Sequence, residues 1–256
     1  MEVKNLTFSY DKKNTVKILD DVSFQIKEKK ITTFLGANGC GKSTLFQLMT
    51  KNLLPDQGKV LLDGKNIINM NQKSFAKKVA CVHQNNQAAG DITVEKLVSY
   101  GRTPYLSMFG ALSKEDKMYV EWAMEAADII KYKDREVGRL SGGQKQRVFI
   151  AMALSQKTEI LFLDEPTTYL DIRYQIELLE MIQRLNRDYQ ITIVMVLHDM
   201  NHAVYYSDEI IGLKDGGVYI QGDPAEVIHS ESIEHIYGIN LDVTTMNDRK
   251  VVMTVR

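Results

Sequence analysis

The chain of 256 residues is long enough for one large domain or two small ones with a buried core. Its 44% hydrophobic and 25% charged residues are ordinary for a globular protein, and its formal net charge of −1 argues against a broad nucleic-acid-binding surface. We expect no secretory signal, because the first residues lack an apolar segment, and the longest aliphatic run, residues 191–197, is too short to cross a membrane. Cys40 and Cys81 show neither disulfide nor zinc spacing, which fits a reducing cytosol.

The first third of the chain is predicted to consist of short β-strands around one helix. The apolar run 31–35 reads as a strand that enters a glycine-rich segment, and residues 43–53 then have helical spacing. The Asp63-Gly64 pair is typical of a hairpin turn within residues 58–67.

The middle of the chain is predicted to be mostly helical. It follows a short strand at 79–82, and Ser113 with Asp116 forms an S-x-x-D capping pattern before a helix with one apolar face. The elements predicted after it are strands at 160–163 and 191–197, a helix at 176–185, a hairpin over 209–221 and a short helix from 223. The sequence therefore predicts the α/β class, with a helical insert in the core.

The sequence GANGCGKST, residues 36–44, fits the phosphate-binding pattern G-x-x-x-x-G-K-[ST] between a predicted strand and a predicted helix. Glycines allow backbone N–H groups to converge on phosphate oxygens, at the positive end of the helix that follows. Lys42 is expected to reach the β- and γ-phosphates, and the Ser43 hydroxyl to ligate Mg²⁺. A plain glycine turn is the alternative, which the flanking strand and helix disfavour. The predicted nucleotide-binding residues of this loop are Gly36, Asn38, Gly39, Cys40, Gly41, Lys42, Ser43 and Thr44.

A second motif, ILFLDEPT at residues 160–167, places two acidic residues at the end of a buried strand. Ligands bind at such strand ends in open α/β sheets. Asp164 is expected to hold Mg²⁺ and Glu165 to polarise the water that attacks the γ-phosphate. Acidic pairs after a strand also serve as helix caps, but the phosphate loop earlier in the chain favours the catalytic interpretation.

A third motif, LSGGQ at residues 140–144, precedes a helix whose N-terminus could bind an anion. One chain has no evident use for a second γ-phosphate site, so we expect this motif to serve the nucleotide of a partner. Its predicted binding residues are Ser141, Gly142, Gly143 and Gln144.

Together the three motifs resemble those of the ATP-binding subunits of ATP-binding-cassette (ABC) transporters, and the resemblance covers nearly the whole chain. It implies a P-loop NTPase core with an antiparallel β subdomain and a helical insert subdomain. The implied division gives residues 1–86 and 157–222 to the core, 87–156 to the helical subdomain and 223–256 to a C-terminal extension. The family implies that ATP and Mg²⁺ bind, and that two copies pair head to tail, with the LSGGQ motif of one over the ATP of the other.

The resemblance implies roles for four further residues. Tyr10 resembles the aromatic residue that stacks on adenine, and Gln84 the glutamine that senses Mg²⁺. Asp171 resembles the aspartate of the D-loop, and His198 the histidine that contacts the γ-phosphate. The expected catalytic residues are thus Glu165, His198, Gln84 and Lys42, and the expected Mg²⁺ ligands are Ser43, Gln84 and Asp164.

Five residues invite other interpretations. His83 and Ala37 stand where the family more often has proline, which we interpret as tolerated variation. Cys40 is either a small packing residue or a thiol whose pKa is lowered by the helix N-terminus, and so open to maleimide inhibition. His198 and His202 have the i, i+4 spacing of a metal pair, but a strand end and a missing third ligand disfavour a metal site.

The segment GRTPYLSMFG, residues 101–110, shows no helical periodicity. It is either a loop stiffened by Pro104 or a segment characteristic of one branch of the family. With the residues around it, it resembles ATPases of importers for ferric siderophores, haem and cobalamin. DEPTTYLDIRYQIELLE and VLHDMNHAVYYSDEI resemble the same branch. In such importers this neighbourhood faces the membrane subunits, so the segment would shape that face.

The resemblance therefore implies a peripheral ATPase on the cytoplasmic face of the membrane. Its implied partners are two permease subunits, a second copy of itself and, indirectly, an extracellular binding protein, with no nucleic acid. Ferric siderophores are the leading candidate cargo, and haem and cobalamin remain alternatives. Soluble ABC ATPases of DNA repair or translation remain an alternative, as does a small-molecule kinase, which would leave LSGGQ and His198 unexplained.

Overall fold

The computed structural model describes residues 1–11, 16–106 and 110–254. The chain forms two compact units, one of Met1–Met70 with Thr192–Arg256 and the other of Asn71–Ile191. Both units contain helices and strands, so the predicted α/β class is confirmed. The subdomain boundaries expected at residues 86, 156 and 222 stay a prediction.

The first unit contains a four-stranded antiparallel sheet with the strand order β2-β1-β4-β5. Its strands are β1 (Glu2–Phe8), β2 (Leu19–Gln25), β4 (Gln57–Leu62) and β5 (Lys65–Asn66). Val22 and Phe24 are buried while their neighbours along β2 are exposed, which is the period of a sheet with one face on the core. Asp63 and Gly64, with φ of 51° and 73°, make the predicted turn between β4 and β5.

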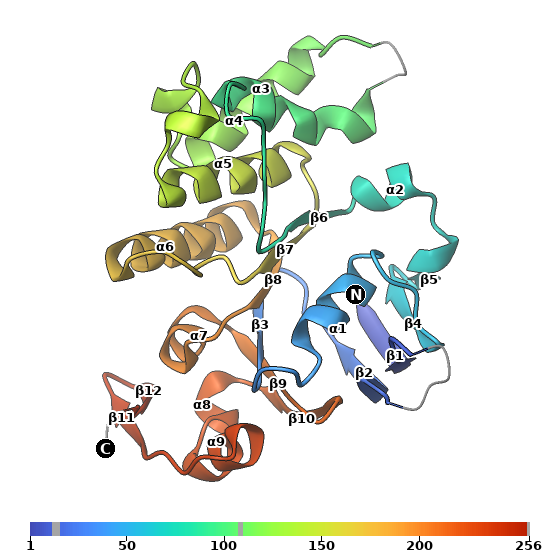
Figure 1. Cartoon of the computed structure of the whole chain (residues 1–256), viewed down its shortest axis with the longest axis vertical. Helices are drawn as coiled ribbons and strands as arrows, with labels where there is room; N and C mark the ends of the chain where they lie inside the picture. Colours follow the sequence, from blue (N-terminus) through green and yellow to red (C-terminus); the bar gives the residue numbers. More distant parts are fainter. Residues whose placement is uncertain (12–15, 107–109, 255–256) are drawn as a thin grey trace. The chain divides into compact units, whose positions relative to one another are not determined.

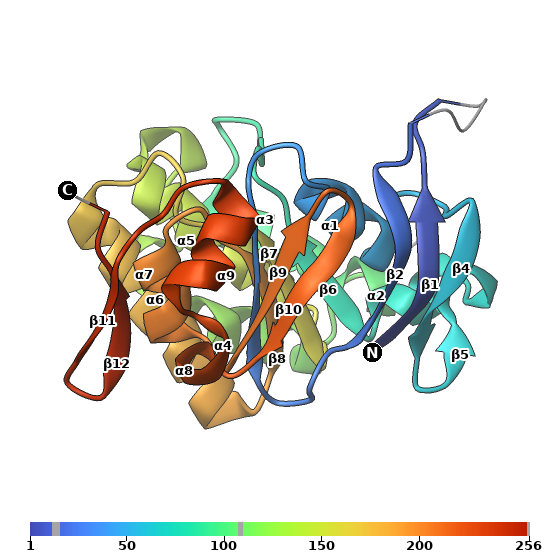
Figure 2. The same cartoon turned by 90° about the horizontal axis from the view of Figure 1, so that it is seen from below.

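The same unit holds parallel strands that carry the phosphate loop. Strand β3 (Ile31–Leu35) pairs in parallel with β8 (Thr192–Val196) on one side and with β9 (Glu209–Lys214) on the other, and β10 (Gly217–Gly222) is antiparallel to β9. All residues of β3 and β8 are buried, as in parallel strands covered on both faces. The remaining elements are α1 (Lys42–Met49), η1 (Ile67–Asn69), α7 (Met200–Tyr206), α8 (Pro224–Val227), α9 (Ser230–Tyr237) and the hairpin β11 (Val243–Met246) with β12 (Arg249–Val252) (Figure 2).

Helix α1 is shorter than the sequence predicts. Its spacing favours a helix to residue 53, but it ends at Met49 with Thr50 as C-cap. Lys51 then takes a left-handed conformation with φ of 62°, which the helix cannot continue through. The apolar Leu53 that extended the predicted period lies beyond this turn.

The second unit contains a parallel strand pair, β6 (Val79–Val82) with β7 (Ile160–Asp164), and a group of helices. The helices are α2 (Gln72–Ala76), α3 (Val94–Ser99), η2 (Tyr100–Tyr105), α4 (Lys114–Ala126), η3 (Ile130–Tyr132), η4 (Val137–Arg139), α5 (Gly142–Ser155) and α6 (Ile172–Tyr189). Helices α3, α4 and α5 pack against one another (Figure 1), and each contributes buried residues, for example Val98, Ala123 and Val148. Among the helices of the described ranges, none combines the length and the apolar character needed to cross a membrane.

The interpretation of residues 101–110 as a loop is wrong for its first part, because Tyr100–Tyr105 forms the 3₁₀ helix η2. Residues 107–109 lie outside the described residues. Gly101 packs so closely on α5 that a Cβ there would lie 2.0 Å from the carbonyl oxygen of Met152. Arg102 is only 3% exposed and donates hydrogen bonds to Asp116 Oδ1 at 2.8 Å and to the Ser155 carbonyl oxygen at 2.7 Å.

This buried ion pair anchors η2 to α4 and α5, and it lowers the pKa of Asp116. Burial by itself would raise the pKa of the carboxyl group, but hydrogen bonds from Ser113 and Arg102, together with the Arg102 charge, hold it below the ordinary value of 3.8. Ser113 and Asp116 also form the predicted capping box at the start of α4. One carboxylate therefore caps α4 and anchors η2.

We predict that Asp116→Asn lowers the free energy of unfolding at neutral pH by about 3 kcal/mol, because it leaves the Arg102 charge buried without its anion. Since the pKa of Asp116 is lower in the folded protein, the wild-type advantage is complete above the ordinary pKa and is lost as the pH falls below about 4. Denaturant unfolding across this pH range measures it. Glu115→Gln, at the exposed neighbouring position, is the control, and equal stability of the two variants would contradict the prediction.

Candidate nucleotide-binding and catalytic site

The phosphate loop connects β3 to α1 in the first unit. Gly36, with φ of 150°, is held between two neighbours, since a Cβ would lie 2.5 Å from the Leu213 carbonyl oxygen and 2.6 Å from Cys40 Sγ. Gly41 is the left-handed N-cap of α1, with φ of 107°. The Lys42 ammonium group donates to the carbonyl oxygens of Gly36, at 2.7 Å, and Ala37, at 2.9 Å. The loop therefore curls around a buried cation at a helix N-terminus, which is a setting suited to phosphate.

The hydroxyl groups of α1 and an aromatic ring lie at the end of this loop. Ser43 is exposed in the first turn of α1, while Thr44 is buried. Tyr10 is 61% exposed, and its hydroxyl group lies 3.2 Å from Thr44 Oγ1. Its ring packs edge-on against Phe8, with 4.9 Å between the ring centroids. The structure thus brings the largely exposed Tyr10 to the phosphate loop, while its contact with adenine stays a prediction.

His198 follows β8 in the first unit and is exposed. The next residue, Asp199, is the N-cap of α7, where its Oδ1 accepts a hydrogen bond from the backbone N–H of His202 at 2.8 Å. The His202 ring instead packs edge-on against Tyr206, with 6.2 Å between centroids. The two histidines thus belong to different environments, one at a strand end and one on a capped helix.

In the second unit, the end of β7 carries Asp164 and Glu165 as predicted. Glu165 has a left-handed backbone with φ of 49°, a strained conformation for a residue with a side chain. Its Oε2 accepts hydrogen bonds from the Gln84 side-chain amide and, at 3.2 Å, from the Thr168 hydroxyl group. The structure therefore joins two predicted catalytic residues, Gln84 and Glu165. It adds Thr168, which the sequence analysis missed although it lies three positions after Glu165.

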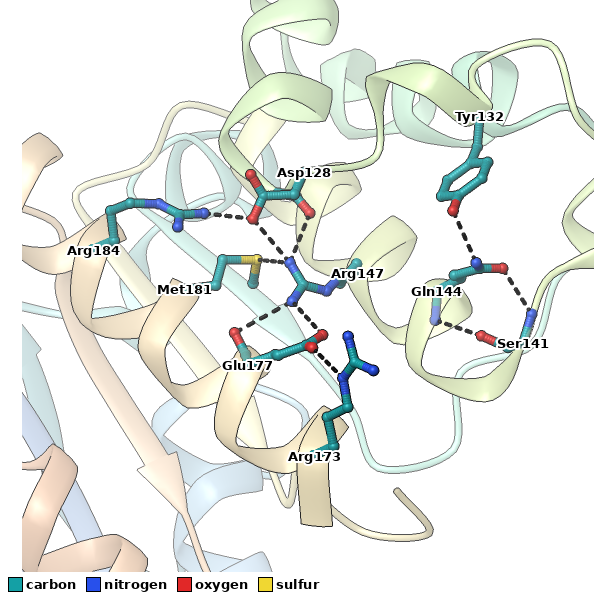
Figure 3. Close-up of polar contacts among 10 residues, drawn as sticks. Asp128, Tyr132, Ser141, Gln144, Arg147, Arg173, Glu177, Met181 and Arg184 are labelled. Atoms are coloured by element: carbon teal, nitrogen blue, oxygen red, sulfur yellow. Dashed lines mark hydrogen bonds and ion pairs between the residues drawn. The ribbon is translucent and has the colours of Figure 1, made fainter. Parts of the chain in front are cut away.

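The LSGGQ motif begins helix α5. Ser141 is the N-cap, and it forms a capping box with Gln144: Ser141 Oγ accepts from the Gln144 N–H, and Gln144 Oε1 accepts from the Ser141 N–H at 3.0 Å (Figure 3). The Gln144 amide also donates to the Tyr132 hydroxyl group at 3.1 Å. Ser141 and Gly142 are exposed at the positive end of this helix. The Gln144 side chain thus shapes the helix start, and Tyr132, which no sequence signal marked, supports it.

Helix α5 is tied to α6, which begins after Asp171, the exposed N-cap residue. Arg147 donates to Asp128 Oδ2 at 3.1 Å and to the Glu177 carbonyl oxygen at 3.3 Å, and Arg184 reaches the same Asp128 oxygen at 2.6 Å (Figure 3). Nearer the helix starts, Gly143 lies against the ring of Tyr174. Arg147 therefore joins the helix that carries the LSGGQ motif to the helix that carries Asp171.

The structure distinguishes the two interpretations of Cys40. Burial raises the pKa of its thiol above the ordinary value, and the nearby Lys42 charge only partly offsets this, so the helix N-terminus does not produce an activated thiol. Cys40 is 8% exposed, with its Sγ 4.0 Å from the Lys42 ammonium group. Burial, reinforced by the charge of Asp164, also raises the pKa of Cys81, to about 11. The alternative, a packing residue, describes Cys40 better than an activated thiol.

Comparison with known proteins identifies the family. The sequence profile described as ABC transporter matches residues 19–168, more than half of the chain. The chain belongs to the ABC transporter family. The ATP-binding subunits of importers in this family are ATPases, and relatives that are similar in sequence include such subunits. This chain is therefore an ABC ATPase, and the predicted family and fold are confirmed.

Individual relatives extend the match. The ABC ATPase is 44% identical to the iron(3+)-hydroxamate import ATP-binding protein FhuC of Bacillus subtilis, over 89% of this chain and 85% of the relative. It is 42% identical to the ferric enterobactin transport ATP-binding protein FepC of Escherichia coli, over 92% and 86%. Its fold resembles that of CbiO1 of Clostridium perfringens, part of the CbiONQ transporter complex, with a TM-score of 0.80, 32% identity and coverage of 91% of both chains. The dimeric cassette MJ0796 bound to ADP and Pi gives a TM-score of 0.74, with 28% identity over 87% and 98%.

We predict that Arg147→Ala lowers the free energy of unfolding by about 2 kcal/mol, because it removes hydrogen bonds to α6 and to Asp128, just beyond the end of α4, and leaves the Glu177 carbonyl oxygen without this donor. Arg173→Ala is the matched control. Arg173 is exposed and pairs with the Glu177 carboxylate at 2.8 Å at the surface, so its loss leaves stability essentially unchanged. Denaturant unfolding of both variants tests this, and a larger effect of Arg173→Ala would refute it.

We also predict that native Cys40 reacts with a maleimide at least about tenfold more slowly than in the unfolded chain, because the buried thiol rarely forms a thiolate. Mass spectrometry of timed labelling, with Cys81→Ser to remove the second thiol, gives the rate. The rate should rise with pH beyond the ordinary thiol pKa of 9.0. Equal rates in the native and unfolded protein would show that Cys40 is an exposed, reactive thiol.

Proposed function

We propose that this ABC ATPase energises the import of a ferric siderophore or a related iron chelate. In this proposal it lies at the cytoplasmic face of the membrane, bound to two permease subunits that receive cargo from an extracellular binding protein. The observation that carries the cargo class is the identity of 42–44% to ATP-binding subunits named for hydroxamate, petrobactin and enterobactin import, each over at least 88% of this chain. Since other chains select the cargo, haem and cobalamin remain outcomes of the test.

ATP would bind through the phosphate loop, residues 36–44, and Tyr10. The curled backbone and the buried Lys42 ammonium group support this role, because they offer N–H groups and one positive charge to the phosphates. The exposed ring of Tyr10 would stack on adenine. Lys42, now held by two carbonyl oxygens of the loop, would exchange these for phosphate oxygens.

Mg²⁺ is a hard cation that prefers oxygen ligands, and the proposed ligands have them: the Ser43 hydroxyl, the Asp164 carboxylate and the Gln84 amide. The exposure of Ser43 at the start of α1 supports its part in this set. The ion, when bound, would neutralise charge that develops on the phosphates. This assignment rests on the donor chemistry of the three residues.

Glu165 would orient and polarise the attacking water. Hydrogen bonds from Gln84 and Thr168 to one oxygen of Glu165 support this role, because they fix the direction of its carboxylate before the reaction. His198, exposed after β8, would contact the γ-phosphate. These residues together would convert ATP to ADP and phosphate.

A second copy of the chain would complete each site. The exposed Ser141 and Gly142 at the N-terminus of α5, and the exposed Asp171, support a contact with the nucleotide held by the partner. The dimeric state of the MJ0796 cassette, a structural relative, supports the pairing. ATP binding would favour the closed dimer and hydrolysis the open one, which is a population shift driven by differential affinity.

The permease subunits would contact the second unit near η2. Tyr100 and Tyr105 are large residues with 49% and 36% exposure, and Lys96 and Lys77 lie over their rings. Such amphipathic aromatic residues are frequent at protein interfaces. Their exposure supports a docking role for this segment, with cargo recognised elsewhere.

The test is uptake of radiolabelled ferric siderophores, haem and cobalamin, each measured separately, in cells that lack this chain, complemented by the wild type or by Glu165→Gln. We predict that the wild type restores uptake of one or more ferric siderophores and that Glu165→Gln, with binding intact, restores less than about 1% of it, since the water is no longer polarised. Ser141→Arg is a second inactive control, because its side chain would obstruct the partner's nucleotide. Restored uptake of haem or cobalamin alone would overturn the siderophore assignment, and restoration by Glu165→Gln would overturn the role of Glu165.

A further inference from the structure

We propose that Tyr237, the last residue of α9, is a positioning residue for the phosphate loop and that its hydroxyl group sets the affinity for ATP. Tyr237 belongs to the C-terminal extension, residues 223–256, which has no role in the function derived above. This inference rests on the proposed role of residues 36–44 as the phosphate loop.

The contact is made at Gly36, the first residue of the loop. The Gly36 N–H donates a hydrogen bond to the Tyr237 hydroxyl oxygen at 3.2 Å. The Gly36 carbonyl oxygen accepts from the Lys42 ammonium group at 2.7 Å. Tyr237 and Lys42 thus hold the same residue through its two backbone polar groups, so the phenol acts on the part of the loop that also orients the lysine.

Gly36 has little room to move in response to a change at Tyr237. A Cβ on this residue would lie 2.5 Å from the Leu213 carbonyl oxygen and 2.6 Å from Cys40 Sγ, so β9 lies on one side of its Cα and the loop's own thiol close by. The Tyr237 hydroxyl group supplies the partner that the buried N–H needs. Without it, the ordered loop would carry an unsatisfied donor, and the loop would gain by leaving this conformation.

Helix α9 is fixed well enough to act as a support. Ile233 and Ile236 are 0% and 3% exposed, and Ile236 Cδ1 approaches within 2.7 Å of the position of a Cβ on Gly212. Gly212 is the register partner of Leu35, the residue before Gly36, in the parallel pair of β3 and β9. Figure 2 shows α9 against β9, so packing at Gly212 places the next residue, Tyr237, beside the loop.

The ionisation of Tyr237 agrees with a role beside phosphates. Burial raises the pKa of its hydroxyl group to about 12, and the nearby Cys40 and Asp199 act in the same direction. The phenol is therefore neutral at physiological pH. It can accept the Gly36 hydrogen bond without adding a negative charge near the phosphates of ATP.

The experiment compares three variants of the full chain by equilibrium titration with ATP and by steady-state hydrolysis. Tyr237→Phe removes only the hydroxyl group. Tyr219→Phe is the matched control, since Tyr219 is 42% exposed on β10 and stacks on His235 instead of the loop. Ile233→Val is the packing control, because it loosens α9 but keeps the phenol.

We expect Tyr237→Phe to raise the Kd and KM for ATP by about three- to tenfold, the effect of losing one hydrogen bond to a buried donor. The kcat should stay within about twofold of the wild type, because no reacting group is removed. Tyr219→Phe should leave the Kd unchanged. Ile233→Val should lower the melting temperature without raising the Kd. If α9 had a merely structural role, loosening it would raise the Kd as well.

An unchanged Kd in Tyr237→Phe, or an equal rise in Ile233→Val, would overturn the positioning role. A fall in kcat at constant KM would also overturn it. If the wild type and Tyr219→Phe fail to bind ATP, the assignment of residues 36–44 as the phosphate loop is wrong, and the inference about Tyr237 loses its basis. Failure of siderophore uptake alone leaves the inference intact, since the titration needs neither permease nor cargo.

Discussion

The close approach of the Gly36 backbone to the Leu213 carbonyl oxygen is the constraint on which the phosphate loop depends. Strand β3 is buried over its whole length between β8 and β9, so the end of β3 has one position, and the chain must turn there without a side chain. The turn delivers Lys42 to the carbonyl oxygens of Gly36 and Ala37 and starts α1 at Gly41. A loop shaped by strand packing costs little to order when a ligand binds, which is the general advantage of preorganisation.

In the second unit, two arginine side chains, Arg102 and Arg147, play the comparable part by joining helices. Arg102 joins η2 to α4 and α5 through Asp116 and the Ser155 carbonyl oxygen, and Arg147 joins α5 to α6 and to Asp128. A planar group with several donors can satisfy several acceptors at once, which suits helices that meet at a point. The result is a rigid frame from which Ser141, Gly142 and Asp171 are exposed, the residues proposed to meet a partner's nucleotide.

Function in this family is divided between chains. The ABC ATPase contains the loop of residues 36–44, a carboxylate at Glu165 held by two hydrogen bonds, and a capped helix that begins at Ser141. The roles proposed for these residues do not depend on the cargo. The proposal of an iron chelate as cargo depends only on similarity to importer subunits. Membership of the family thus rests on the three motifs and on the match to the family's sequence profile. The proposed cargo class rests on similarity to particular importer subunits.

The sequence by itself determined the α/β class, the three motifs and the family, because each motif is a local pattern whose chemistry depends on neighbouring residues. It also predicted the capping box of Ser113 and Asp116 and the turn at Asp63-Gly64, which are local as well. Contacts between distant residues were decided only by the tertiary structure: the anchoring of η2 through Arg102, the raised pKa of Cys40, and the supports that Thr168, Tyr132 and Tyr237 give to the motifs. Burial and long-range hydrogen bonds set these features, and neither can be read from the spacing of residues along the chain.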